Sequence, residues 1–198
     1  MDRRWFIRRI KTTKMEKVIT LSLVLFLSFL SFSQTKYLTK TGIVSFEASV
    51  PSFEEVKATT ASTTVILNTD NGEFAALIFV KGFRFKNALM EEHFNENYAE
   101  SDIYPKATFK GQLTNFNLEN ISEVKQIITY SGRLEFHGKT KMLENLELSI
   151  SASSTNIINL EGEFEVNTDD FDIEIPKVVS NKLSKTVSVK FAFELKKR

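Results

Sequence analysis

Two consecutive stretches, IITYSGRLEF at residues 127–136 and MLENLELSISA at residues 142–152, decide the fold of this chain. Apolar side chains share one face of the first stretch, at Ile128, Tyr130, Leu134 and Phe136. The second stretch repeats the pattern from Leu146 to Ala152. A period of two is typical of a strand with one buried and one solvated face. Because the turn sequence HGKT at 137–140 lies between them, the two stretches predict an antiparallel hairpin.

The same alternation recurs and predicts about eight strands after residue 34. The clearest further example runs from Ile158 to Val166, and Asp70-Asn71-Gly72 is a strong hairpin turn because Asn-Gly tolerates positive φ values. Helical spacing predicts a helix over 87–98, and Pro176 predicts a short one over 177–182. A sheet of this size hides its edges best by closing. We therefore expect an all-β fold, a closed antiparallel eight-stranded lipocalin-like barrel with one or two short helices; a two-sheet sandwich is the alternative.

The first 33 residues have the pattern of a signal peptide. Residues 1–17 are basic, residues 18–32 form an uncharged apolar run, and Ser31 and Ser33 offer small side chains for cleavage. The apolar run is shorter than the roughly 20 residues of a membrane-spanning helix. We expect cleavage near Ser33, a single domain over 34–198, and a periplasmic or secreted protein. An uncleaved amino-terminal anchor is the alternative, and Met15 is an alternative start.

The charge balance argues against a nucleic-acid partner. The chain has 26 Lys and Arg and 25 Asp and Glu; residues 1–33 carry seven and two of these, so the remainder has 19 against 23, a net charge of −4. Affinity for nucleic acid depends on neutralising phosphates, which a mildly acidic domain does poorly. The chain contains no cysteine, which excludes disulfides and a lipid-modified cysteine.

Phenylalanine is abundant, with 18 residues in the chain and fourteen after residue 33. Such a set either fills a core or lines a space for an apolar ligand. Small residues on the same inward faces, such as Ala48, Ala76, Gly111, Gly132 and Gly162, indicate room along the barrel axis. The side chains that we expect to line the pocket are Phe46, Phe74, Ile78, Phe109, Leu113, Ile128, Tyr130, Phe136, Leu148, Leu160, Phe164, Phe191 and Phe193.

No catalytic or metal-binding pattern stands out. The serines lie in no Gly-x-Ser-x-Gly elbow, there is no glycine-rich phosphate loop, and Glu161, Glu163 and Glu165 fall on a solvated strand face. His93 and His137 occur in separate contexts without cysteine, so we expect no metal, no catalytic residues and no enzyme activity. For His137 two interpretations stay open: contact with a ligand head group, or a turn residue whose ring bonds nearby backbone.

Three segments resemble the YceI-like family of exported bacterial proteins. They are YPKATFKG at 104–111, GRLEFHGKTK at 132–141 and DFDIEIP at 170–176, in the order that the family has them. The resemblance implies an extended, lipocalin-like antiparallel barrel around an elongated apolar tunnel that holds an isoprenoid chain. We expect no cofactor, apart from a bound polyisoprenoid or quinone lipid.

These observations predict an exported lipid-binding protein that holds a polyprenyl lipid or quinone and acts in transport, storage or sequestration. Peripheral contact with a membrane is expected, and no oligomeric state is indicated. The alternative is a non-catalytic barrel or sandwich module that binds a protein partner at the cell surface, through an exposed apolar patch around Phe83, Phe85 and the 87–98 helix. A lipid hydrolase or isomerase would need a polar triad at the mouth of the barrel.

Overall fold

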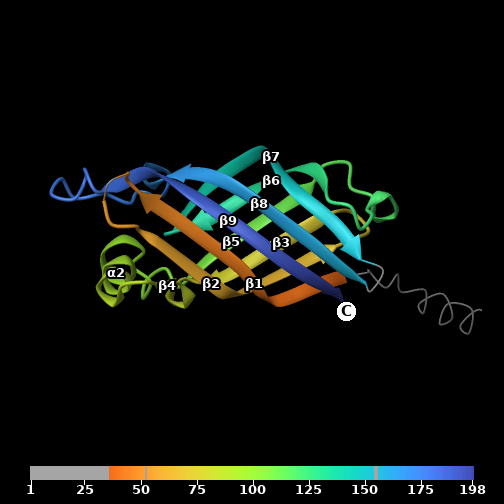
Figure 1. Cartoon of the computed structure of the whole chain (residues 1–198), viewed down its shortest axis with the longest axis horizontal. Coiled ribbons are helices and arrows are strands. Elements are labelled where there is room, and N and C mark those ends of the chain that lie inside the picture. Colours follow the sequence, from red (N-terminus) through yellow and green to blue (C-terminus); the bar gives the residue numbers. More distant parts are fainter. Residues whose placement is uncertain (1–35, 52, 154–155) are drawn as a thin grey trace, which may run out of the picture. The chain divides into compact units, whose positions relative to one another are not determined.

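The structure is a computed structural model, and it describes residues 36–51, 53–153 and 156–198. The predicted signal peptide at 1–33 lies outside the described residues. Strands make up most of these ranges (Figure 1). They are β1 (Lys36–Ser49), β2 (Lys57–Asn68), β3 (Glu73–Phe79), β4 (Arg84–Phe85), β5 (Lys106–Leu113), β6 (Gln126–Phe136), β7 (Lys139–Ser153), β8 (Ile157–Asn167) and β9 (Leu183–Lys197).

Eight of these strands close into a barrel. Their order is β1-β9-β8-β7-β6-β5-β3-β2, and β2 pairs again with β1, from Lys36 opposite Asn68 to Glu47 opposite Lys57. Every pairing is antiparallel. The two-residue strand β4 pairs with Ala58 and Thr59 near the start of β2, beyond the stretch of β2 that pairs with β3. The predicted closed eight-stranded barrel is therefore confirmed, in preference to the sandwich.

A bulge in β7 shifts the alternation of the hairpin that decides the fold. Asn145 has a positive φ of 52°, and its N–H donates to the Ser131 hydroxyl oxygen of β6 at 2.9 Å. The pairing register of β6 and β7 shifts at the same place. An extra residue re-aims the strand, so Leu143 is buried at 5 % exposure while its neighbour Met142 is 51 % exposed.

The predicted helix over 87–98 is present as α2 (Ala88–His93), which continues as the wider turn η2 (Phe94–Tyr98). The Asn87 side-chain oxygen accepts from the Leu89 N–H at 2.9 Å and caps α2. The second predicted helix, over 177–182, is wrong: this segment forms successive turns, with Val179 N–H donating to the Pro176 carbonyl. Val178 is 83 % exposed there, so no packed face offsets the cost of starting a helix.

One end of the barrel is solid. Leu67, Leu113, Leu148, Ile158 and Leu195 are almost completely buried there. The loop after β5, with η3 (Leu118–Asn120), packs Phe116, Leu118 and Ile121 against this core. The predicted Asn-Gly turn joins β2 to β3, and Gly72 has a φ of +77° with no room for a Cβ beside Phe116. Among the described residues, this end is therefore closed by packed side chains.

The other end carries the long connections. It is formed by the β1–β2 loop, by the segment with η1 (Val80–Gly82), β4 and α2, and by the β8–β9 loop with η4 (Thr168–Phe171). Figure 1 shows α2 and the β8–β9 loop at this end and the carboxyl terminus at the opposite one. Among the described residues no helix has the length and apolarity needed to cross a membrane.

Candidate functional site

An apolar cavity of about 600 Å³ occupies the barrel interior next to these connections. Its wall comes from β1, β3, β5, β6, β8 and β9, and the β1–β2 loop, α2, η2, η4 and the β8–β9 loop complete its mouth. The volume is in the range of small-molecule and cofactor pockets. Apart from Tyr130, the polar lining residues, among them Glu54, Asn167 and Lys182, come from the mouth half of the wall.

Four phenylalanines gather at the mouth. Phe46 of β1 packs its ring 5.0 Å from that of Phe83 and 5.1 Å from that of Phe94, and the Phe85 and Phe94 rings lie 5.2 Å apart. Phe83 and Phe85 line the cavity, and Phe83 is buried. The exposed patch expected around these two residues is therefore wrong. Because β4 pairs with β2, these rings face inward and Arg84 between them faces out.

A second aromatic group forms the inner end of the cavity. Tyr130 of β6 lies at the centre of this group, with ring centroids 5.8 Å from Phe74, 5.9 Å from Phe109 and 6.1 Å from Phe191. Phe193 stacks on Phe191 at 5.0 Å. These rings come from β3, β5, β6 and β9, so the group spans the barrel and separates the cavity from the solid end.

Glycines determine where two of these rings lie. A Cβ at Gly162 would come within 2.5 Å of Phe191 Cζ, and one at Gly132 within 2.4 Å of Phe109 Cζ. The rings therefore rest on the bare backbone of the glycines. We expected the glycines to leave room along the barrel axis, and this needs a correction. The rings of Phe109 and Phe191 fill the space beside Gly132 and Gly162, and the cavity lies on the other side of these rings.

Nine of the thirteen predicted pocket residues line the cavity. They are Phe46, Phe74, Ile78, Phe109, Tyr130, Phe136, Phe164, Phe191 and Phe193. The other four, Leu113, Ile128, Leu148 and Leu160, belong to the core outside the cavity. Their side chains do face inward, but they sit at the solid end. A period of two reports which face a residue is on and carries no information about its depth along the barrel.

His137 lies outside the cavity. Its Nδ1 is 2.8 Å from the Phe171 carbonyl oxygen, its Nε2 is 2.7 Å from Glu100 Oε2, and its ring packs on Tyr104 at 4.6 Å. A carbonyl can only accept, so Nδ1 carries a hydrogen. With both nitrogens engaged, His137 is not placed to contact a ligand head group, and the alternative interpretation as a backbone-bonded turn residue describes its position. The ring ties the β6–β7 hairpin to η4.

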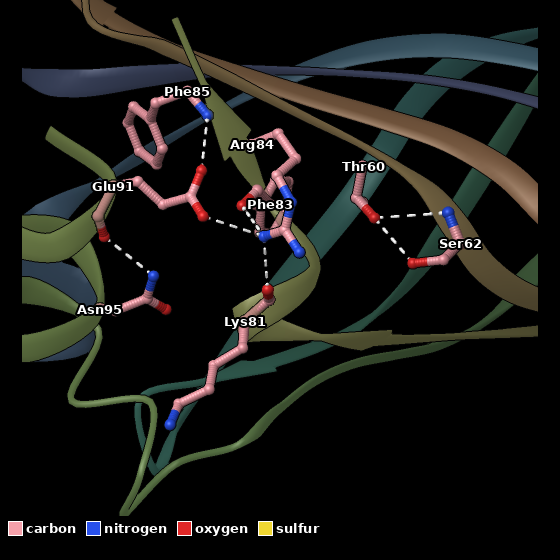
Figure 2. A network of polar contacts seen from close by, with 8 residues as sticks. All are labelled: Thr60, Ser62, Lys81, Phe83, Arg84, Phe85, Glu91 and Asn95. Carbon is pink, nitrogen blue, oxygen red and sulfur yellow. Dashed lines mark hydrogen bonds and ion pairs between the residues drawn. The ribbon is translucent and has the colours of Figure 1, made fainter. Parts of the chain in front are cut away.

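A polar network fastens α2 to the rim of the barrel (Figure 2). Arg84 Nη1 lies 2.8 Å from the Lys81 carbonyl and 3.0 Å from Glu91 Oε1. Glu91 Oε2 accepts the Phe85 N–H at 3.1 Å, and Asn95 Nδ2 donates to the Glu91 carbonyl at 2.8 Å. These contacts hold the helix face that carries Met90, His93 and Phe94 against the cavity.

The helix residues and the polar rim were not among the predicted pocket residues. Met90, His93 and Phe94 recur at helical spacing, so the predicted helix over 87–98 indicates that these three residues share one face. The contributions of Thr168 and Lys182 follow from how the β8–β9 loop folds over the mouth, for which the sequence shows no periodic pattern. Within the described residues, no three His, Cys, Asp or Glu side chains come together in a metal-binding group.

An ion pair fixes the start of η4. Lys141 Nζ donates to Asp170 Oδ1 at 2.8 Å, and the Asn167 N–H donates to Asp170 Oδ2 at 3.1 Å. The hydrogen bond from Lys141, followed by that from Asn167, holds the pKa of Asp170 below its ordinary value of 3.8. Because Asn167 and Thr168 line the cavity, this pair supports one side of the mouth.

Solved structures of other proteins share this barrel. A polyisoprenoid binding domain from Saccharophagus degradans, implicated in plant cell wall breakdown, aligns with a TM-score of 0.72 at 16 % identity, over 84 % of this chain and all of that one. Burkholderia cenocepacia BcnA aligns with a TM-score of 0.61 at 13 % identity, over 78 % and 95 % of the two chains. The Campylobacter jejuni YCEI protein gives 0.51 at 12 % identity, over 69 % and 80 %.

A search of curated proteins finds no match to this chain. The family model of the YceI-like domain matches residues 30–195, which is most of the sequence and includes seven of the barrel strands in full and β9 as far as Leu195. The sequence match and the closed barrel agree, and the chain belongs to the YceI-like family.

Proposed function

We propose that this protein binds an isoprenoid-type lipid, a polyprenyl lipid or a quinone, in the barrel cavity and acts as a carrier or store of that lipid rather than as an enzyme. The observation that supports the proposal best is the cavity itself, an apolar space of about 600 Å³ that opens at one end of the barrel. The fold shared with a polyisoprenoid binding domain supports the choice of lipid.

The cavity volume sets the length of chain that can be enclosed. If each heavy atom takes the ~30 Å³ of a water molecule in the liquid, the cavity holds roughly 20 heavy atoms, or about four isoprene units. Burial at about 0.8 kcal/mol per CH2 gives about 16 kcal/mol. Association costs about 4–15 kcal/mol, so such a chain binds without any charged contact. A longer chain would extend through the mouth.

The lipid would enter from a membrane surface. Three exposed apolar side chains surround the mouth on three separate segments: Phe53 on the β1–β2 loop, Leu89 on α2 and Val178 on the β8–β9 loop, 44 %, 56 % and 83 % exposed. Apolar side chains at a rim favour peripheral contact with a bilayer. The signal-peptide pattern of residues 1–33 supports export, and we propose that the protein works in the periplasm or outside the cell.

Lipid analysis tests the proposal. The protein is purified from the envelope fraction of its own host, extracted with organic solvent and examined by mass spectrometry; delipidated protein is then offered prenyl alcohols and short-chain quinones. We expect a co-purifying isoprenoid and saturable uptake of at least one of these compounds. A protein that emerges lipid-free and takes up none of them contradicts the proposal.

A pair of variants on β3 separates cavity binding from surface binding. Ala76 lines the cavity, whereas the preceding residue, Ala75, does not. Ala76→Phe fills part of the space and should reduce uptake, while Ala75→Phe adds the same side chain outside the cavity and should leave uptake unchanged.

A further inference from the structure

His137 makes two contacts that together need a proton on each nitrogen of its ring. Nδ1 lies 2.8 Å from the Phe171 carbonyl oxygen, and Nε2 lies 2.7 Å from Glu100 Oε2. A carbonyl oxygen and a carboxylate oxygen can only accept, and a neutral imidazole has a single N–H. Either neutral tautomer would therefore turn a bare nitrogen toward an acceptor. Both contacts form at the same time only when the pair holds one extra proton, which the imidazole takes because it is the stronger base.

The two partners belong to separate segments of the cavity mouth. Phe171 is the last residue of η4, and it lines the cavity. Glu100 follows η2, whose last residue, Tyr98, also lines the cavity. The Glu100 carbonyl accepts the Tyr104 N–H at 2.9 Å, which fixes the backbone of this turn. The ring of His137 therefore joins η4 to the turn after η2.

The His137 ring is held in place by its surroundings. The His137 side chain is 11 % exposed, whereas that of Glu100 is 43 % exposed. The ring packs on Tyr104 with a centroid distance of 4.6 Å, and a Cβ at the next residue, Gly138, would lie 2.7 Å from the same tyrosine ring. A ring nitrogen that loses its partner here finds little water in exchange, and an unpaired buried polar group is unfavourable. Loss of the proton should therefore separate the ring from one of its two partners.

Two ion pairs flank His137. Lys139 pairs with Asp172 and Lys141 with Asp170, so both also tie the β6–β7 hairpin to η4 and the residue after it. Lysine and aspartate side chains ordinarily stay charged between about pH 5 and pH 8, whereas an imidazole changes its charge in that range. The charged or titratable groups on the elements packed against the ring are Glu100, Tyr104, Lys139, Lys141, Asp170 and Asp172. The contacts of His137 are therefore the ones at this junction that respond to pH near neutrality.

We propose that His137 is a proton-dependent latch on the mouth of the cavity. In its protonated form the ring joins η4 to the turn after η2, and the cavity releases its lipid slowly. As the pH rises and the ring loses its proton, one of the two contacts is lost and the lipid leaves faster. The inference rests on the proposed function and adds a control of lipid release by pH.

Lipid release measured at two pH values tests the latch. The protein is loaded with radiolabelled geranylgeraniol and mixed with phosphatidylcholine vesicles at about pH 5.5 and at about pH 8, on either side of the ordinary titration of an imidazole. Neither the alcohol nor this phospholipid changes its charge between the two conditions. We expect release from the natural chain to be about two- to tenfold faster at the higher pH, the range for the loss of one hydrogen bond. Equal rates at the two pH values would overturn the proposal.

Two variants remove the proton requirement in different ways. In Glu100→Gln the amide can accept from a protonated ring and donate to a neutral one, so the release rate should be the same at both pH values. In His137→Asn the new side chain tolerates the positive φ of 49° at this position but is too short to join both partners. This variant should release lipid at the faster rate at both pH values. The full pH dependence of the natural chain in either variant contradicts the latch.

His93 provides the control for the assignment, because it is the other histidine of the chain and lines the cavity. Whatever its absolute rates, His93→Gln should keep the ratio of release rates that the natural chain has at the two pH values. If His93→Gln abolishes this ratio and Glu100→Gln keeps it, the titrating group is His93 and the proposal is overturned.

Hydrogen exchange of the lipid-free protein separates the latch from the proposed function. The Ile173 N–H donates to the Thr168 carbonyl at 3.1 Å and reports on η4. After correction for the intrinsic exchange rate at each pH, its protection should fall as the pH rises in the natural chain and stay constant in Glu100→Gln. If protection falls in this way but the natural chain binds no lipid, the latch holds and the proposed function fails. Protection that does not change with pH in the natural chain overturns the latch.

Discussion

Replacing Gly162 by alanine should push Phe191 into the cavity. The added Cβ would lie 2.5 Å from Phe191 Cζ and 3.2 Å from Leu148 Cβ. Gly162 is paired with both residues across neighbouring strands, so the backbone is held on both sides and the ring has to move by roughly 1 Å to reach ordinary contact. Overpacking of this kind lowers the free energy of unfolding by about 1–3 kcal/mol. Alanine also reduces the conformational entropy of the unfolded chain, which restores about 0.4–1 kcal/mol of stability. A net loss of about 1 kcal/mol is expected.

Urea denaturation measures this loss as a lower midpoint at constant slope. If the ring is the cause, most of the cost of Gly162→Ala should disappear in a Phe191→Leu background, which a double-mutant cycle detects as coupling. Gly82→Ala is the matched control, because the atoms nearest to the added Cβ would be the hydroxyl oxygens of Ser62 and Thr60, at 3.2 and 3.3 Å. An equal cost of Gly162→Ala with and without the Phe191 ring would refute the reasoning.

Three other perturbations test the mouth. Arg84→Ala removes the ion pair with Glu91; because the pair is exposed, global stability should fall by less than ~1 kcal/mol, while hydrogen exchange of α2 amides should become faster than in the natural chain. Asp170→Asn should lower the urea midpoint at pH 7 and reduce the further loss of stability on acidification. The pKa of Asp170 in the folded chain is below its ordinary value of 3.8, so the ionised carboxylate stabilises the fold above pH 3.8. This contribution disappears as the pH falls through the folded-state pKa. Serine at both Leu89 and Val178 should slow lipid uptake from vesicles and leave affinity measured from cyclodextrin unchanged.

Most of the barrel could be predicted because one physical rule repeats along the chain. A strand with one buried face places apolar residues at every second position, and the run from Ile158 to Val166 keeps that rule without interruption. The rule fails where a β-bulge interrupts the alternation of the strand. The bulge at Asn145 moves the buried position to Leu143, and no pattern in the sequence marks this shift.

The cavity was harder to predict than the fold. Leu148 and Phe164 obey the same alternation, yet one packs in the solid end and the other lines the cavity, since inward direction and axial depth are separate quantities. The orientation of Phe83 depends on a two-residue pairing with β2, which is too short to produce a period. His137 illustrates a third limit: its partners, Glu100 and Phe171, are distant in sequence and are brought together only by the closed fold.

Thiol protection tests most directly whether the lipid occupies the barrel. The chain contains no cysteine, so Ala76→Cys and Ala75→Cys each introduce a single thiol, one on the cavity wall and one beside it on β3. With a small thiol reagent, we predict that saturating geranylgeraniol or menaquinone slows modification of Ala76→Cys and leaves the rate for Ala75→Cys unchanged. Equal rates for Ala76→Cys with and without bound lipid would contradict occupation of the cavity.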